Sequence, residues 1–186
     1  MSVQEIVLYP EHEVALRKKS ESVRVVNQNI RRLIGDLRDT LLAHPEGVGL
    51  AAPQINKHQR VVVVRLGAGP DTDTEPSQPL ALVNPVIVDA QDERKDFDGC
   101  LSIPGIYGET RRPHHLSVIS RDESGKTVNR VFEGFDAVVV HHEIDHLDGI
   151  LFIDRIEQWE DLYQLRVNEQ GSMVRVPVSL PLEQYR

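Results

Sequence analysis

The segment His142-Glu143-Ile144-Asp145-His146 has the residue types and the spacing of a metal site on a helix. Residues four positions apart share one face of an α-helix, so both imidazoles can reach one metal ion while the glutamate lies beside it as a base. Cys100 is the only cysteine of the chain, and Gly99 before it and Pro104 after it predict a tight turn. A thiol in such a turn is a candidate metal ligand.

A catalytic site of this kind needs a third protein ligand, because three protein groups leave one position for water. Cys100 would complete a Cys-His-His site. A carboxylate would instead complete the two-histidine site of a zinc endopeptidase, and the downstream candidates are Asp148, Asp154 and Glu157. His141 is not an expected ligand, because on a helix it points about 100° away from His142. We expect it to support the site from outside or to lie at the surface.

Two helices are predicted to position these groups. The first runs over 27–43, starts at Asn27 or Asn29 and stops before Pro45, and its apolar face consists of Ile30, Leu33, Ile34, Leu37 and Leu41. The second runs over 135–147 and carries the HExxH motif. Residues 6–24 are expected to form an extended arm. A third, amphipathic segment is expected near 156–167, followed by a proline-interrupted tail over 174–182.

The strand predictions follow from runs and alternation of apolar residues. A valine run over 60–65 predicts a strand buried on both faces. Residues 80–83 and 86–88 predict strand on either side of a bend or bulge at Asn84-Pro85. Residues 116–121 and 127–132 predict a hairpin with its turn at 122–125, and 67–79 predicts an exposed loop. We expect one α+β domain over 1–186, with mixed or antiparallel sheets around the HExxH helix and a variable tail from about 168 to 186.

Composition narrows the class of protein. Lys and Arg number 21 against 29 Asp and Glu, so the net charge is −8, which argues against binding a phosphate backbone such as DNA. One cysteine excludes an internal disulfide framework. No apolar run reaches the length of a membrane span, and the first residues lack an export signal. These features predict a cytoplasmic protein of bacterial type with no membrane partner.

Three segments together resemble the motifs of the peptide deformylase family, in family order, and the resemblance covers nearly the whole chain. They are Gly47-Val48-Gly49-Leu50-Ala51-Ala52-Pro53-Gln54, Gly99-Cys100-Leu101-Ser102 and His142-Glu143-Ile144-Asp145-His146-Leu147-Asp148-Gly149. The chain departs from the family pattern at three places. Asp98 replaces a usual Glu, His141 replaces a usual Gln, and the segment after Pro104 lacks a frequent Arg.

The resemblance implies a role for each residue of the site. Cys100, His142 and His146 would hold one divalent metal ion, Fe2+ in the cell, with Zn2+, Ni2+ or Co2+ able to replace it. Glu143 would take a proton from water and deliver it to the leaving amine. The Gln54 side chain and the Leu101 N–H would stabilise the developing oxyanion.

The implied reaction removes the formyl group from the N-terminal N-formylmethionine of new polypeptides and releases formate. The substrate is expected to add as a strand along Val48-Gly49, with Gly47 and Gly49 leaving room for its backbone. Its methionine is expected to enter a pocket formed by Val48, Phe135, Val138 and Val139. A monomer with transient ribosome contact is expected. The alternatives are the HExxH zinc endopeptidase named above and a deformylase-like binding protein whose departures at Asp98 and His141 have abolished turnover.

Overall fold

The computed structural model describes residues 2–67, 78–168 and 170–178, which form an α+β structure around one antiparallel sheet. The strands of the described residues are β1 (Gly49–Ala51), β2 (Val61–Val64), β3 (Leu80–Gly99), β4 (Tyr107–Arg121), β5 (Thr127–Glu133), β6 (Leu162–Val167) and β7 (Met173–Pro177). They pair in the order β1-β2-β3-β4-β6-β7. β6 pairs with residues 107–108 at the start of β4, and β5 pairs with residues 115–121 at its other end. The expected fold class is confirmed, with antiparallel pairing throughout.

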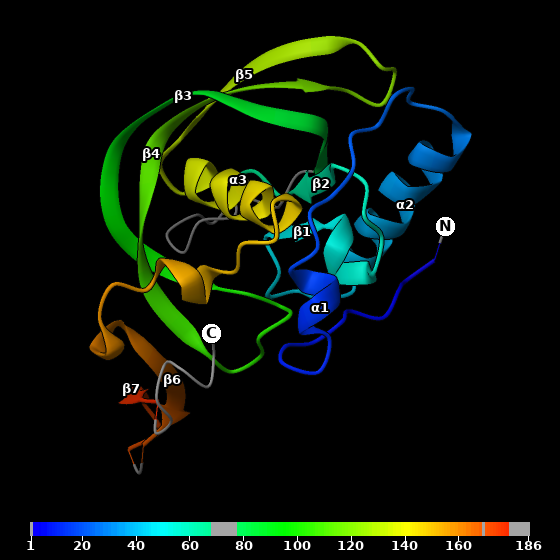
Figure 1. The fold of residues 1–186 in the computed structure, drawn as a ribbon. Helices are drawn as coiled ribbons and strands as arrows, with labels where there is room; N and C mark the ends of the chain where they lie inside the picture. Colours follow the sequence, from blue (N-terminus) through cyan, green and yellow to red (C-terminus); the bar gives the residue numbers. More distant parts are fainter. Residues whose placement is uncertain (1, 68–77, 169, 179–186) are drawn as a thin grey trace.

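Helix α3 (Gly134–Leu147), which carries the HExxH motif, lies in the hollow of the curled sheet (Figure 1). Its Val138-Val139-Val140 run has low helix propensity, so burial must stabilise it, and each of the three valines is at most 5% exposed. Apolar residues of β1, β2 and β4 pack against the helix in one cluster. The helix is therefore held from several strands at once.

Strands β3 and β4 are much longer than the sequence predicted. The expected bend at Asn84-Pro85 is present, because the register between β3 and β4 shifts twice between residues 83 and 89, and Asn84 has a φ of 51°. Beyond residue 88, however, β3 continues to Gly99, and β4 begins at Tyr107 rather than near 116. Residues 91–95 of β3 are exposed, so backbone hydrogen bonds to β4 alone extend the strand there. The sequence of this part has no apolar alternation that would predict a strand.

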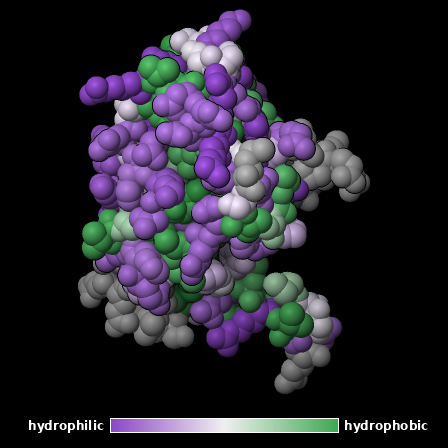
Figure 2. Space-filling model, turned by 90° about the vertical axis from the view of Figure 1, so that its right-hand side faces the viewer, coloured by the Kyte–Doolittle hydropathy of each residue, from purple (hydrophilic) through white to green (hydrophobic). Residues whose placement is uncertain are grey.

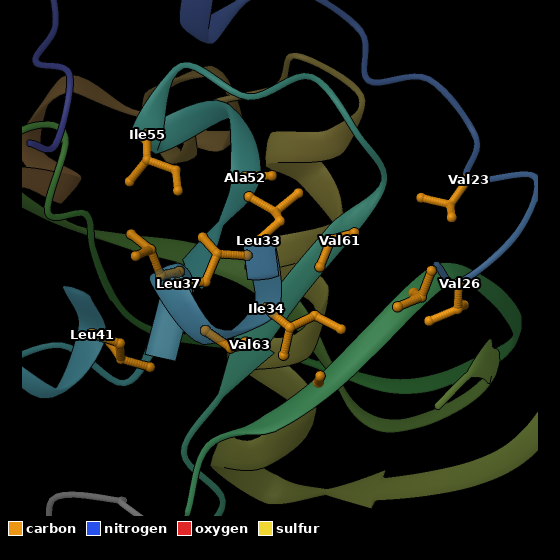
Figure 3. Close-up of a cluster of buried hydrophobic side chains, with 13 residues drawn as sticks. Val23, Val26, Leu33, Ile34, Leu37, Leu41, Ala52, Ile55, Val61 and Val63 are labelled. Carbon is orange, nitrogen blue, oxygen red and sulfur yellow. The ribbon is translucent and has the colours of Figure 1, made fainter. Parts of the chain in front are cut away.

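Helix α2 (Gln28–Leu42) matches the predicted first helix and covers the other face of β2. Asn27 caps it by accepting a hydrogen bond from the Ile30 N–H at 3.1 Å. Figure 3 shows the buried cluster between this helix and the strands, to which the helix contributes Leu33, Ile34, Leu37 and Leu41. The predicted apolar face is thus confirmed, with Ile30 partly buried at its edge.

Two expectations for the chain ends are corrected. The N-terminal arm is not wholly extended, because α1 (Glu13–Leu16) forms one short helix in it. The segment expected to be amphipathic over 156–167 is a short 3-10 turn, η3 (Trp159–Asp161), followed by strand β6. Leu162 and Tyr163, the first two residues of this strand, are buried, and Leu162 packs in an apolar cluster with Phe152 and Ile156. β6 pairs with β7, and this hairpin projects from the rest of the molecule (Figure 1).

Hydrophilic side chains cover much of the face in Figure 2, with apolar side chains between them. None of the described helices is long and apolar enough to cross a membrane. The exposed loop expected over 67–79 falls largely on residues 68–77, which lie outside the described residues, as do residues 179–182 of the expected tail.

Gly149 fixes how the HExxH helix ends against the N-terminal arm. Its φ is +76°, a left-handed conformation that favours glycine, and a Cβ there would lie 2.1 Å from the backbone oxygen of Arg17. The arm also donates a hydrogen bond from the Ser20 N–H to the Leu147 carbonyl at 2.8 Å. A side chain at position 149 would therefore separate the arm from the end of α3.

We expect Gly149→Ala to destabilise the protein more than Gly125→Ala. Gly125 also has a positive φ, but a Cβ there would meet no atom closer than 3.7 Å. Gly125→Ala should cost about 1–2 kcal/mol for the left-handed conformation, whereas Gly149→Ala should cost about 1–3 kcal/mol more for the forced separation. Urea unfolding midpoints measure both. Equal losses in the two variants would show that the contact with Arg17 is unimportant.

Candidate metal centre

The thiol of Cys100 and the imidazoles of His142 and His146 meet inside the hollow of the sheet. Sγ of Cys100 lies 3.2 Å from Nε2 of His146, which lies 3.1 Å from Nε2 of His142. All three donor atoms lie within 4.8 Å of one another, and both imidazoles are buried. Cys100 comes from the turn after β3, while the imidazoles come from successive turns of α3, so the cluster joins sheet and helix.

The carboxylates that could have completed a two-histidine site are engaged elsewhere. Each lies in an ion pair with an arginine: Asp148 with Arg60, Asp154 with Arg17, and Glu157 with Arg111. Among the described residues, the group that could hold a metal ion is Cys100, His142 and His146. The Cys-His-His alternative is therefore the one that the geometry favours.

The Asp98 carboxylate orients the first imidazole. Its Oδ1 lies 2.7 Å from Nδ1 of His142, a separation that requires a proton between them, so Nδ1 donates and Nε2 is left for a metal ion. Burial alone lowers the pKa of His142, but the Asp98 charge and hydrogen bond outweigh it and raise that pKa well above its usual value. Burial alone raises the pKa of Asp98, but the charges of Arg112 and His142 outweigh it and keep that pKa well below its usual value.

His146 is held in the neutral form that a metal ligand requires. It is fully buried, and burial lowers its pKa to about 3, with the charge of His142 acting in the same direction. Its Nδ1 has no hydrogen-bond partner among the described residues. His146 and His142 each offer an imidazole nitrogen, the latter oriented by Asp98, and Cys100 offers a thiol. Together they form a donor set that suits zinc or iron.

Glu143 is a buried carboxylate beside this cluster. It is 3% exposed, and burial raises its pKa to about 7. Its Oε2 has no hydrogen-bond partner within the described part of the chain. On the other side, a Cβ built on Gly49 of β1 would lie 2.4 Å from Oε1. Glycine at position 49 thus leaves room for a carboxylate that is free to accept a proton.

The two residues expected to stabilise an oxyanion lie next to Cys100. Gln54 lies in the 3-10 turn η1 (Ala52–Ile55), and its Oε1 accepts a hydrogen bond from the Ala51 N–H at 2.8 Å. This leaves its Nε2 directed to Cys100 Sγ at 3.4 Å and to Ser102 Oγ at 3.3 Å. Leu101 follows Cys100 in the turn closed by the Ile103 N–H and the Cys100 carbonyl.

The residues expected to bind substrate are brought together in part. Gly47 and Leu101 are close, because a Cβ on Gly47 would lie 3.0 Å from Leu101 Cδ1. Val48, Phe135 and Val139 belong to one apolar cluster, whereas Val138 is buried on the same helix outside that cluster. A cavity of about 560 Å³ lies elsewhere, between Leu66, Leu80, Asp136 and residues 130–133, and none of the expected site residues lines it.

Sequence reasoning missed Arg112, which is fully buried behind the site. Its Nε donates to Asp98 Oδ2 at 2.7 Å and its Nη1 to Asp145 Oδ2 at 2.8 Å. Arg155 pairs with the same Asp145. The neighbouring Arg111 is exposed, so the Arg-Arg-Pro run itself carries no signal. Positions 108, 110 and 112 of β4 all face inward, but they hold Gly, Thr and Arg, so no apolar alternation in the sequence indicates a buried position at Arg112.

Two imidazoles and a thiol around one point, with a buried glutamate beside them, define a metal-dependent hydrolase. The polypeptide deformylase family model matches residues 3–161, and the chain belongs to that family. It is accordingly an enzyme of the metal-dependent class that removes the formyl group from the N-terminus of new polypeptides.

Individual relatives agree with the family assignment. A peptide deformylase of Thermomicrobium roseum is 42% identical over 170 residues, which is 91% of this chain and 95% of that protein. The crystal structure of the Ehrlichia chaffeensis deformylase is 34% identical, with a TM-score of 0.76 over 86% of this chain and 91% of its own. The Thermotoga maritima deformylase is 33% identical, with a TM-score of 0.74 over 85% of this chain and all of its own.

We expect Gly49→Ala to reduce hydrolysis while leaving metal binding intact. The new Cβ would displace the Glu143 side chain, to which the three atoms nearest to it all belong. Because a displacement of about 1 Å in a reacting group can cost about 100-fold, the loss should appear in kcat. Formate release and metal content of the same preparation measure it. A variant with normal kcat would contradict the close approach of β1 to Glu143.

Proposed function

We propose that this chain binds one divalent metal ion through Cys100, His142 and His146 and uses Glu143 as the general base that hydrolyses N-formylmethionyl peptides. The observation that carries the proposal is the convergence of three donor atoms within 4.8 Å beside a buried carboxylate oxygen with no partner among the described residues. Family membership supplies the reaction, and the geometry supports the assignment of each residue to it.

The chemistry follows from what each side chain can do. When bound, a divalent metal ion makes hydroxide available at neutral pH. Glu143 accepts the proton that water loses, since its pKa of about 7 lets it hold and release a proton at neutral pH. Hydroxide adds to the formyl carbon, and Glu143 then gives the proton to the leaving nitrogen. The C–N bond breaks, and formate and a free amino terminus are released.

Negative charge that develops on the formyl oxygen needs hydrogen-bond donors. The Nε2 of Gln54 is directed to Cys100 because Oε1 is fixed by the Ala51 N–H. We assign Gln54 and the Leu101 N–H as these donors, and removing one such donor costs about 100- to 1000-fold in rate.

The edge of the sheet next to the site supports the proposal that the substrate binds as an extended peptide. β1 is the first strand in the sheet order and pairs only with β2 among the described strands. A peptide added as a further strand along Gly47, Val48 and Gly49 would bring its first residue near Glu143. We propose that its methionine side chain enters the apolar region formed by Val48, Phe135, Val138 and Val139.

We propose Fe2+ as the ion in the cell, with Zn2+, Ni2+ or Co2+ able to occupy the same ligands. A thiolate and two imidazoles suit iron and zinc alike. In an oxidising medium the Cys100 thiolate is the group at risk, which fits the expected cytoplasmic location. Anaerobic purification followed by metal analysis and a formate-release assay on one preparation identifies the ion.

We further propose a single catalytic domain with a variable tail from about residue 168, acting as a monomer that contacts the ribosome transiently. The family match ends at residue 161, before β6 and β7. Light scattering measures the oligomeric state, and cosedimentation with ribosomes measures the contact.

Glu143→Ala should retain bound metal and lose deformylation of formyl-Met-Ala-Ser by about 100- to 10,000-fold. The three proposed ligands remain, so metal content should stay near one ion per chain. Glu133→Ala, which removes an exposed glutamate just before the same helix, is the matched control and should be unaffected. Full activity in Glu143→Ala would refute the assigned role. Bound metal without formate release in the parent protein would favour the impaired binding protein.

Cys100→Ala should lose metal together with activity, because two imidazoles alone bind a divalent ion weakly. Ser120→Ala provides the control, since it also shortens a buried side chain, but on β4 away from the site. Metal analysis after dialysis and formate release are measured side by side. Retained metal, together with cleavage of internal bonds in unformylated peptides, would instead support the endopeptidase alternative.

A further inference from the structure

His141 and His142 are neighbours in the sequence, yet a chain of three hydrogen bonds also connects their rings. Nδ1 of His141 lies 2.7 Å from Nη1 of Arg112. Nε of Arg112 donates to Oδ2 of Asp98 at 2.7 Å, and Oδ1 of Asp98 accepts from Nδ1 of His142 at 2.7 Å. These hydrogen bonds and the backbone between residues 141 and 142 form a closed ring of contacts. The ring reaches Nδ1 of His142, whereas the metal is proposed to bind its Nε2.

The direction of the first hydrogen bond is fixed by chemistry. A guanidinium has five N–H donors and no acceptor, so His141 must accept from Arg112 through an unprotonated Nδ1. Its side chain is 13% exposed, and Arg112 is fully buried. A buried N–H without its acceptor is costly, so Nη1 depends on His141 and on Asp145, to which it also donates.

The guanidinium is one of four groups in the described part of the chain that hold the Asp98 carboxylate by hydrogen bonds. Both Asp98 oxygens are shared: Oδ2 accepts from Arg112 and from the hydroxyl of Thr110, and Oδ1 accepts from His142 and from the Gly99 N–H. Without an acceptor at position 141, Nη1 would keep only Asp145 as its partner among the described residues, and we expect the guanidinium to shift toward it. Such a shift would lengthen the hydrogen bond from Arg112 to Asp98 and weaken the one that orients the imidazole of His142.

We propose that His141 is a positioning residue for the metal ligand His142. By accepting a hydrogen bond from Arg112 it holds the Asp98 carboxylate against Nδ1 of His142 and keeps Nε2 directed toward the metal. The inference rests on the proposed metal site. It assigns to His141 no contact with substrate or with the metal itself.

Two substitutions separate the hydrogen bond from the bulk of the ring. His141→Leu places a methyl group where Nδ1 lies and removes the acceptor. His141→Asn keeps an acceptor oxygen at the same number of bonds from Cβ. Loss of a group that orients a ligand typically costs 10- to 100-fold in metal affinity, so we expect about that loss for Ni2+ in His141→Leu. His141→Asn should keep the parent affinity.

A second measurement reads the orientation without metal. In the apoprotein, the 15N shifts of the His142 ring report whether Nδ1 carries the proton that Asp98 accepts. These shifts should move in His141→Leu and stay in place in His141→Asn, which a merely structural role of His141 would not produce. His115→Leu, which removes a partly exposed histidine of β4 paired with Glu133, is the control and should change neither quantity.

Circular dichroism first establishes that each variant is folded, and if His141→Leu is not, His141→Ala replaces it. The inference is overturned if the acceptor-free variant and His141→Asn have the same Ni2+ affinity and the same His142 ring shifts, whether both match the parent protein or both differ from it. A parent protein that binds no Ni2+ would contradict the proposed function instead. The apoprotein shifts would then decide the role of His141 alone.

Discussion

The pairing of buried charges between α3 and the β3–β4 ribbon is the constraint on which the rest of the molecule depends. Arg112 is fully buried, and a charge in that position is tolerated only when it is paired and hydrogen-bonded. Its partners lie on two elements, with Asp98 on β3 and Asp145 on α3. The helix can therefore occupy one depth and one rotation in the hollow of the sheet, and that rotation presents His142 and His146 to Cys100.

The site has two sides. On one side of the imidazoles the charged groups of the described residues are paired, and on the other Glu143 is not. Behind the imidazoles, carboxylates and guanidinium groups neutralise one another and hold the rings. In front, Glu143 is buried, its Oε2 has no hydrogen-bond partner among the described residues, and burial raises its pKa to about 7. Glycine at position 49 then admits the edge strand to within contact of that carboxylate. The proposed base and the edge proposed to bind peptide are adjacent because no side chain separates them.

The sequence predicted what depends on local pattern. The HExxH spacing, the apolar face of α2 and the turn at 122–125 each need only neighbouring residues, and each is present. Long-range pairing was not predictable. Residues 91–95 form strand without any apolar alternation, and Arg112 is buried only because Asp98 and Asp145 arrive from distant elements. The amphipathic pattern over 156–167 did not reveal that this segment is a short turn followed by a strand.

Arginine at position 112 is required by geometry as well as by charge. One planar group reaches Asp98 through Nε, while Nη1 reaches both Asp145 and His141, so its donors leave in fixed directions toward two elements. A lysine ammonium would neutralise the same charge as a single point but could not span these acceptors. Because the directions are fixed, a change at any one acceptor is transmitted to the others. That rigidity connects a residue outside the metal cluster, His141, to the orientation of His142.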